Sequence, residues 1–349
     1  MAAAAEADDV PGYRIAAVEA WVGENVAGLT PPFEWQKLEG GHSNLTYALT
    51  DREQRRAVVR RPPLGELLPK AHDMRREYKV ISGLGPTEVP VPTAYGFCDD
   101  QTVTGSDFYV MSQVGGRALY TSEDSVEHLD EAARGQVGRS FIETLSALHA
   151  VDPVDVGLDD LGRHDGYVSR QLRTWYGSWN ASMDAADYDD PRVHELHDHL
   201  VANIPDQGPA RVVHGDFGMH NCMFDADGNV AAVLDWEIAT LGDPLADFAY
   251  ALNAWGEPGS ADALSPEGAT QAPGFLPPDA LIEMYASNSG RNLDQLAFYQ
   301  SFNHLKTTCI LHGVYARYRM GQKSAEGVDM DGLKTRMIAT LDRAAEMLA

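Results

Sequence analysis

Hydrophobic positions follow a helical spacing near the start of the chain and again over most of its second half. Between residues 13 and 27, Ile15, Val18, Val22 and Val26 recur three or four positions apart, which predicts an amphipathic helix. After Gly115 and Gly116 the same spacing predicts a series of helices, at residues 129–148, 165–183, 191–203, 244–255, 278–289, 293–320 and 332–348.

The region from residue 33 to 113 has a different texture, with short β-rich runs separated by Gly, Pro and charged turns. The runs lie at residues 45–50, 57–60 and 108–113, and one helical stretch interrupts them at 70–84. This predicts a small antiparallel sheet with one helix, so we expect an α+β chain with an N-terminal lobe over residues 1–114. The C-terminal lobe, residues 115–349, is expected to be larger and mainly helical.

Two features of the C-terminal lobe depart from the helical pattern. Short strands are predicted at residues 211–213 and 230–234. Residues 256–277 are rich in Pro, Gly, Ser and Ala, which predicts a surface loop and a candidate lid.

The charge of the chain excludes several kinds of partner. It has 27 basic and 52 acidic residues, a net charge of −25, which repels nucleic acid and anionic lipid and weakly favours a cationic ligand. No apolar run approaches the ~18 residues of a membrane span, and no basic segment precedes an apolar stretch at the N-terminus. We therefore expect a cytoplasmic protein with no nucleic acid or membrane partner. Its three cysteines are far apart, which predicts buried free thiols, and the sequence does not indicate an oligomeric state.

The strongest chemical signal is a loop that follows a predicted strand and reads His214-Gly215-Asp216. Asn221 lies five residues after Asp216, and Asp235 lies fourteen residues after Asn221, beyond a predicted hairpin turn. Phosphoryl transfer needs a carboxylate that orients a hydroxyl and accepts its proton, and oxygen ligands for Mg²⁺. We expect Asp216 to be the base or hydroxyl-orienting group, Asn221 a metal ligand and Asp235 the principal metal ligand. His214 is expected to brace the loop rather than transfer protons.

This segment resembles the aminoglycoside phosphotransferase and choline kinase family, relatives of the protein kinases. That family has a His-Gly-Asp-x-x-x-x-Asn loop and a metal-binding Asp after the next hairpin. Residues 234–250 are similar to its next segment, and the resemblance is strongest to the kinase-like domain fused to certain acyl-CoA dehydrogenases. The resemblance implies a protein-kinase-like two-lobed fold, ATP and Mg²⁺ as cofactors, and transfer of the γ-phosphate to a small-molecule hydroxyl. It also implies that Asp247 braces the catalytic loop from a helix that Asp243 caps and Pro244 begins.

A Gly-rich segment at residues 40–47 lies between two predicted strands. Paired glycines let backbone N–H groups approach phosphate oxygens, and neighbouring polar side chains add donors. Taken alone, an ordinary hairpin turn explains the segment. Because the family has a similar loop over ATP, we assign Gly41, Ser43 and Asn44 to the nucleotide.

The kinase-like arrangement implies two further nucleotide contacts. Kinases place a cation on the third strand, paired with a Glu on the next helix; Arg60 and Glu77 hold these positions here, with Arg61 as the alternative if the register shifts by one residue. Arg replaces the family's usual Lys, but it keeps the charge and can bind phosphate in a bidentate manner. Residues 108–116 read as the hinge strand, where backbone groups of Ser112 and Val114 would hydrogen-bond adenine.

The sequence does not identify the molecule that accepts the phosphoryl group. Relatives imply aminoglycosides, amino-alcohols such as choline, sugars and hydroxyacyl thioesters, and the link to acyl-CoA dehydrogenases favours the thioester over the cationic acceptor that the net charge favours. The alternative from another class is a catalytically silent, nucleotide-binding kinase-like scaffold; the retained Asp216, Asn221 and Asp235 argue against it. A kinase acting on proteins is disfavoured, because a helix begins at Pro244 and leaves little room for a peptide-docking activation segment.

Overall fold

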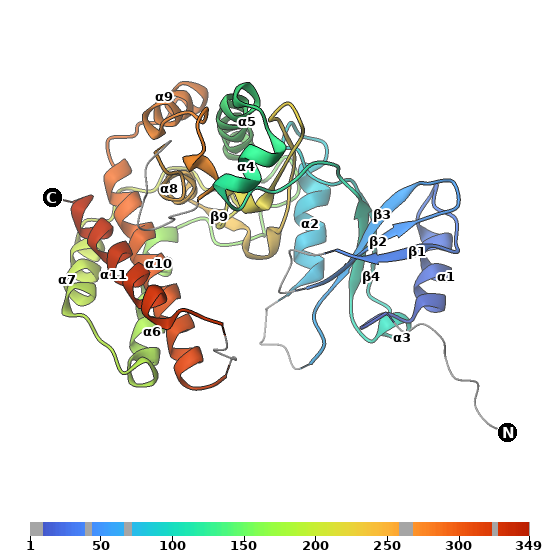
Figure 1. The fold of residues 1–349 in the computed structure, drawn as a ribbon, viewed down its shortest axis with the longest axis horizontal. Helices are drawn as coiled ribbons and strands as arrows, with labels where there is room; N and C mark the ends of the chain where they lie inside the picture. Colours follow the sequence, from blue (N-terminus) through green and yellow to red (C-terminus); the bar gives the residue numbers. More distant parts are fainter. Residues whose placement is uncertain (1–9, 39–43, 66–71, 258–267, 323–326, 349) are drawn as a thin grey trace. The chain divides into compact units, whose positions relative to one another are not determined.

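The computed structural model describes residues 10–38, 44–65, 72–257, 268–322 and 327–348. The chain divides into two compact units, Met1–Gly116 with Ala231–Ala239, and Arg117–Val230 with Thr240–Ala349 (Figure 1). The segment Ala231–Ala239, which carries Asp235, therefore belongs to the first unit although it lies late in the sequence. None of the helices within these described ranges combines the length and apolarity that crossing a membrane requires.

The first unit is built on a five-stranded antiparallel sheet with the strand order β1-β2-β3-β5-β4. In the described part of this unit the sheet is accompanied by the α-helices α1 (Ile15–Asn25), α2 (Met74–Leu84) and the short α3 (Gln101–Thr104), and by the 3-10 helix η2 (Trp236–Ile238). The strands are β1 (Glu34–Lys37), β2 (Leu45–Thr50), β3 (Arg56–Arg61), β4 (Ala94–Cys98) and β5 (Phe108–Ser112).

The two faces of this sheet bury different kinds of side chain. On one face, Val18 and Val22 of α1 form a hydrophobic core with Leu49, Val59 and other strand residues. The other side of the sheet is covered by α2, which packs against β4 and β5 (Figure 1). Because successive strand residues point to opposite faces, Arg60 lies on the α2 side while its neighbour Val59 points to the α1 core.

The second unit is mainly helical and packs around α10 (Leu296–Arg319), which contacts α6 (Tyr167–Ala186), α8 (Pro244–Asn253) and α11 (Met330–Glu346). A two-stranded antiparallel sheet, β6 (Arg211–Val213) with β9 (Thr240–Gly242), lies beside these helices. The remaining elements with a part in this unit are α4 (Ser122–His128), α5 (Glu131–Ala150), α7 (Pro191–Ala202), α9 (Pro278–Ser289), β7 (Cys222–Phe224), β8 (Val230–Val233), η1 (Met219–Asn221) and η3 (Ala269–Gln271).

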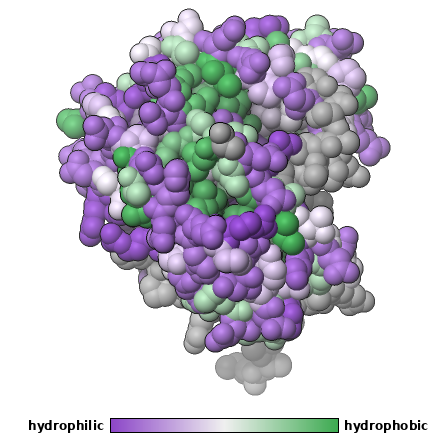
Figure 2. All heavy atoms as spheres, turned by 90° about the vertical axis from the view of Figure 1, so that its left-hand side faces the viewer, coloured by the Kyte–Doolittle hydropathy of each residue, from purple (hydrophilic) through white to green (hydrophobic). Residues whose placement is uncertain are grey.

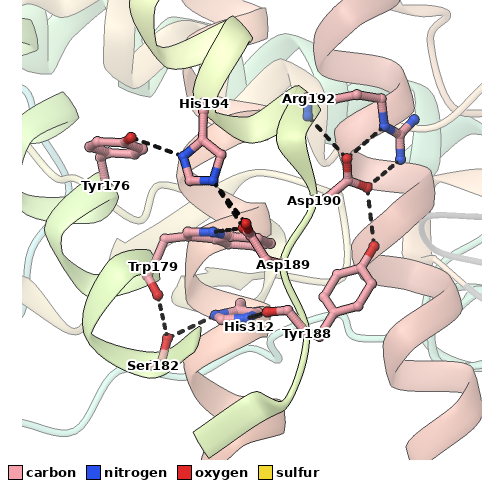
Figure 3. A network of polar contacts seen from close by, with 9 residues as sticks. All are labelled: Tyr176, Trp179, Ser182, Tyr188, Asp189, Asp190, Arg192, His194 and His312. Carbon is pink, nitrogen blue, oxygen red and sulfur yellow. Dashed lines mark hydrogen bonds and ion pairs between the residues drawn. The ribbon is translucent and has the colours of Figure 1, made fainter. Parts of the chain in front are cut away.

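Polar side chains as well as apolar ones hold the helices of the second unit together. The ring of His312 on α10 stacks on Trp179 of α6 with 3.8 Å between ring centroids (Figure 3). Its Nδ1 lies 2.8 Å from Ser182 Oγ on α6, and its Nε2 lies 3.0 Å from the Tyr188 carbonyl. Both ring nitrogens of this fully buried histidine are thus satisfied, which fixes α10 against α6. The face of this unit seen in Figure 2 is mostly hydrophilic, as the acidic composition predicts, with hydrophobic atoms gathered in a hollow.

The predicted α+β class is confirmed, and most predicted elements differ from the observed ones by only a few residues at their ends. Elements with little hydrophobic pattern were not predicted: β1, β4, α3, α4 and β9. Helix α4 forms from a polar sequence because Thr121 and Asp124 make a reciprocal capping box. The predicted surface loop is wrong over its last part, because Ala269, Thr270 and Phe275 are buried. All three cysteines are free and buried, as expected.

Candidate active site

A buried cluster of charged side chains gathers around Arg60 in the first unit. The Arg60 Nε lies 3.1 Å from Glu77 Oε2 of α2, and its Nη2 donates to Asp235 Oδ1 at 2.7 Å. The Tyr109 hydroxyl on β5 donates to the same Glu77 oxygen at 2.8 Å. The structure therefore shows the predicted pair of Arg60 with Glu77, and it places Asp235, which was predicted separately as a metal ligand, beside the same arginine. The alternative, Arg61, points to the other face and donates to the carbonyls of Gly12, Pro62 and Thr104.

The backbone at Asp235 adopts a conformation that favours glycine. Its φ is +63° and its ψ is +60°, the left-handed region, which costs a residue with a Cβ on the order of 1 kcal/mol or more. The segment is held in place nearby, since the Arg76 guanidinium on α2 donates to the Ala239 carbonyl and the Trp236 ring N–H donates to Val233. Such strain persists where the surroundings impose it, and it is often found at functional sites.

The same cluster offers oxygen atoms for a divalent cation. Glu77, Asp235 and Glu237 each present a carboxylate oxygen within 4.8 Å of the other two. Oε1 of the buried Glu77 has no hydrogen-bond partner among the described residues. Buried polar atoms without partners are rare in folded proteins, and Mg²⁺ prefers oxygen ligands. The donor set therefore fits a metal-bound polyphosphate, with Glu237 as a residue that the sequence did not single out.

Burial shapes the charges of this cluster. It raises the pKa of Glu77 to about 7, and the Arg60 charge and the Tyr109 hydroxyl offset part of the rise. For Arg60, burial by itself lowers the pKa, but the Glu77 charge, followed by Tyr109 and Asp235, raises it overall, so the guanidinium stays protonated. Arg60 is thus a permanent cation with two carboxylate partners.

Replacing Arg60 by Met tests whether this cation binds phosphate as well as holding the cluster together. Arg60→Met leaves buried Glu77 unpaired, so we expect the free energy of unfolding to fall by about 3 kcal/mol in urea titrations. We also expect ATP affinity to fall at least about tenfold in calorimetric titrations, because a charge-assisted contact to phosphate is lost. Arg61→Met is the matched control: it removes a buried strand arginine but should leave ATP affinity unchanged. Equal ATP affinities for the two variants would contradict the assignment.

The structure describes only some of the other residues that were predicted to contact the nucleotide. Gly41 and Ser43 lie outside the described residues, and Asn44 is buried at the start of β2. The Ser112 N–H donates to the Thr93 carbonyl at 2.9 Å, so an adenine contact at Ser112 has to use its carbonyl instead. Val114 is half-buried in the connector after β5.

In the second unit, the loop after β6 is fixed by the buried carboxylate of Asp247. Its two oxygens accept the backbone N–H groups of His214 and Gly215, each at 2.7 Å. Gly215 has φ +84°, a conformation that a side chain would strain. Asp243 caps α8 at Pro244, which aims Asp247 at the loop. Both expectations for this helix are therefore confirmed.

His214 takes part in the hydrogen bonding within the loop. It is fully buried, and its Nδ1 accepts the Asp216 N–H at 3.3 Å. This confirms the expectation that it braces the turn. A second histidine, His149 of α5, lies behind the loop with Nε2 3.3 Å from Asp247 Oδ2 and Nδ1 2.7 Å from the Tyr285 hydroxyl.

Acid should destabilise the second unit through His149 and Asp247. Burial lowers the pKa of His149, so the unfolded chain takes up a proton near pH 6.5 that the folded chain resists, and stability falls below about that pH. For Asp247, burial raises the pKa, but the hydrogen bond and charge of His149, followed by His214, lower it overall. Its contribution is complete above the unfolded pKa of about 4 and is lost as the pH falls through the folded pKa.

Urea unfolding between pH 8 and 4 measures this effect. We expect His149→Gln to flatten the fall in stability between about pH 6.5 and 5, because glutamine does not titrate. Replacing the exposed His199 by Gln should leave the curve unchanged. If His149→Gln also left the slope unchanged, the buried histidine would not be its source.

The Asp216 carboxylate accepts hydrogen bonds from three side chains. Oδ1 accepts the Tyr250 hydroxyl at 2.5 Å, while Oδ2 lies 3.2 Å from Asn221 Nδ2 and 3.3 Å from His220 Nε2. Burial by itself raises its pKa, but the hydrogen bond and charge of His220, followed by the Tyr250 hydroxyl, lower the pKa to about 2. Asp216 is therefore an anion at neutral pH, and a base this weak is better suited to orienting a hydroxyl than to removing its proton early.

The structure joins Asn221 to Asp216 directly. The Asn221 amide nitrogen donates to the Asp216 carbonyl at 2.9 Å as well as to its carboxylate, so neither of these two bonds uses the amide oxygen. Sequence reasoning missed Tyr250 and His220. The signal for Tyr250 was its position three residues after Asp247, which places both on one helix face. His220 lies four residues after Asp216.

The fold and site define the class of protein. Residues 34–283 match the phosphotransferase enzyme family (APH), which is more than half of the chain, so the chain belongs to that family. Acyl-CoA dehydrogenase family member 11 of Gallus gallus is 37% identical to it over 301 residues, which cover 83% of this chain and 38% of that protein. The chain thus spans less than half the length of the curated relatives that it matches first.

Solved structures show the same fold. A candidate aminoglycoside phosphotransferase from Ralstonia eutropha has a TM-score of 0.81 at 29% identity, covering 96% of this chain and 99% of that chain. An aminoglycoside phosphotransferase in a ternary complex with ADP and hygromycin B has a TM-score of 0.61 at 15% identity, covering 94% and 98%. The expected protein-kinase-like fold is therefore confirmed.

Proposed function

We propose that this chain is an ATP- and Mg²⁺-dependent phosphotransferase that moves the γ-phosphate of ATP to a hydroxyl group of a small molecule. The observation that supports this most is the anionic Asp216 carboxylate on a loop whose backbone Asp247 fixes. Mg²⁺ would neutralise charge on the triphosphate when bound, and Asn221 and Asp235 would supply oxygen ligands for it. Arg60 would contact the α- and β-phosphates.

Asp216 has two tasks in this reaction. It first accepts a hydrogen bond from the acceptor hydroxyl, which orients the oxygen toward the γ-phosphorus. As the new O–P bond forms and the bond from the γ-phosphorus to the β-phosphate oxygen breaks, the hydroxyl proton passes to Asp216 and ADP leaves. Because the pKa of Asp216 is low, this proton moves late, when the acceptor oxygen has become more acidic.

For the acceptor, we propose a hydroxyacyl thioester. The support is the group of relatives called acyl-CoA dehydrogenase family members, which carry a segment like this chain. An amino-alcohol or aminoglycoside acceptor is the second candidate, supported by the likeness to a candidate aminoglycoside phosphotransferase.

A panel of acceptors tests this function. The protein is incubated with Mg²⁺ and ATP and with a hydroxyacyl-CoA series, the free hydroxy acids, choline or an aminoglycoside, while ADP release and the mass of each acceptor are followed. We expect acceptor-dependent ADP release and an acceptor heavier by one phosphoryl group, with the greatest rate for a thioester. If ATP binds but no acceptor is modified, the chain is a nucleotide-binding scaffold instead.

A further inference from the structure

Besides Asp247, Asn221 and His220, the side chains of Tyr250 and Lys306 contact the Asp216 loop within the second unit. Tyr250 comes from α8, three residues after Asp247, so one face of this helix contacts both the backbone and the carboxylate of the loop. The 2.5 Å between the Tyr250 hydroxyl and Asp216 Oδ1 is shorter than the distances from Asn221 or His220 to Oδ2. A hydroxyl-to-carboxylate bond of this length is charge-assisted and strong.

Lys306 of α10 supports the same arrangement from the neighbouring helix. Its Nζ donates to the Gly215 carbonyl at 3.0 Å and lies 4.6 Å from the centroid of the Tyr250 ring. The residue is only 7% exposed, and this buried ammonium is stabilised by the carbonyl, by the face of the aromatic ring and by the charges of Asp216 and Asp247. One cation thereby holds both the loop backbone and the tyrosine that contacts Asp216.

The carboxylate needs such support because it is not enclosed. The Asp216 side chain is 35% exposed, and an aspartate has two rotatable side-chain bonds. Orienting a hydroxyl for attack requires the carboxylate to stay within about 0.5 Å of the productive geometry. A partner at Oδ1 restricts rotation of the carboxylate and leaves its exposed side accessible to an acceptor.

We propose that Tyr250 and Lys306 are positioning residues for phosphate transfer: the Tyr250 hydroxyl holds the Asp216 carboxylate, and Lys306 holds the Tyr250 ring and the Gly215 carbonyl. The acceptor hydroxyl then meets Asp216 in one orientation. This inference rests on the proposed function, because it assigns the two residues to the orienting task of Asp216.

Tyr250→Phe removes the hydroxyl and keeps the ring that faces Lys306. We expect kcat for transfer to fall by about 10- to 100-fold, as is typical when the hydrogen-bond partner of an essential side chain is lost. The KM for ATP should change less than about twofold, because the ATP contacts assigned above do not include Tyr250. Tyr188→Phe is the matched control, since it removes a tyrosine hydroxyl that donates to a carboxylate, Asp190 Oδ2 at 3.1 Å, in a network remote in sequence from the loop (Figure 3). Its kcat should equal that of the unaltered protein.

A double-variant cycle separates positioning from a merely structural role. If Tyr250 acts through Asp216, adding Tyr250→Phe to Asp216→Asn should cost almost nothing further in residual transfer, measured at high enzyme concentration. Additive losses, or a Tyr250→Phe variant as active as the unaltered protein, would overturn the inference. Should Tyr250→Phe not fold, the same cycle is run with Lys306→Met. The inference predicts that Lys306→Met lowers transfer in the unaltered protein but causes almost no further loss when Asp216→Asn is already present.

A crystal structure of Tyr250→Phe tests the inference without an activity assay. We expect the Asp216 carboxylate to leave its side-chain rotamer or to occupy two; an unchanged single rotamer would overturn the inference. Lack of transfer to any acceptor by the unaltered protein would instead count against the proposed function, so the two failures are distinguishable.

Discussion

Asp216→Asn should lower kcat for phosphate transfer by about 10³-fold, which is within the usual contribution of a general base. The amide keeps the shape of the side chain and its neighbours, but it cannot accept the proton of the acceptor hydroxyl and carries no negative charge. ATP affinity should stay within about twofold, because the charge contacts to the nucleotide are assigned to Arg60 and the carboxylates of the first unit. Acceptor-dependent ADP release and calorimetric ATP titration measure the two effects.

The control for this substitution is Asp227→Asn, an exposed aspartate in the turn between β7 and β8. The substitution makes the same chemical change eleven residues away, and it should leave both the rate of transfer and the ATP affinity unaltered. Transfer by Asp216→Asn at the unaltered rate would remove Asp216 from its assigned role. Loss of ATP binding in this variant would show that the carboxylate acts on the nucleotide instead.

Asp235→Asn should abolish the tightening of ATP binding by Mg²⁺ and lower transfer by about 10³-fold, since a bound metal contributes several kcal/mol to such reactions. The amide retains one oxygen but no charge, so the divalent ion loses its principal anionic ligand. Asparagine is also among the residues that tolerate the left-handed backbone found here, so the turn itself should persist. ATP titrations with and without Mg²⁺ separate the loss of the metal from the loss of the nucleotide.

Asp99→Asn provides a matched comparison in the same unit. Asp99 pairs with Arg75 at 2.7 Å, the distance between Asp235 and Arg60, but on the exposed surface. It should change neither Mg²⁺ dependence nor transfer. If Asp235→Asn bound Mg²⁺ and ATP like this control, the metal would have to be assigned to other carboxylates, of which Glu237 is the first candidate.

The conformation of the His-Gly-Asp loop could be predicted from the sequence because its requirements are local. An apolar strand, a glycine in a left-handed turn and an aspartate a fixed distance before Asn221 all lie within a dozen residues, and Asp243 with Pro244 specifies where α8 begins. From that start, the helical spacing alone places Asp247 and Tyr250 on one face. The conformation of this loop and the start of α8 therefore follow from residues that are close together in the chain.

The partners of these segments depend on tertiary contacts that no local pattern encodes. The sequence favours Arg60 as the phosphate ligand but leaves Arg61 as the alternative if the register shifts by one residue, and the face on which each strand residue lies separates them. Lys306 lies within the long hydrophobic pattern of α10, where a buried lysine is unexpected unless its partners, Gly215 and Tyr250, are known. Glu237 follows Asp235 by two residues, but its place beside Glu77 depends on how the segment after β8 packs on α2.

The ion pair of Arg60 with Asp235 has a consequence for the order of binding. In the ligand-free protein each of these two residues is paired with the opposite charge of the other, so neither charge is left without a partner. A phosphate that binds the Arg60 guanidinium weakens its pairing with Asp235, so Asp235 becomes available to a divalent cation. A cation bound to Asp235 likewise makes Arg60 available to phosphate. Each ligand thus makes room for the other, and by linkage the two should bind with positive cooperativity.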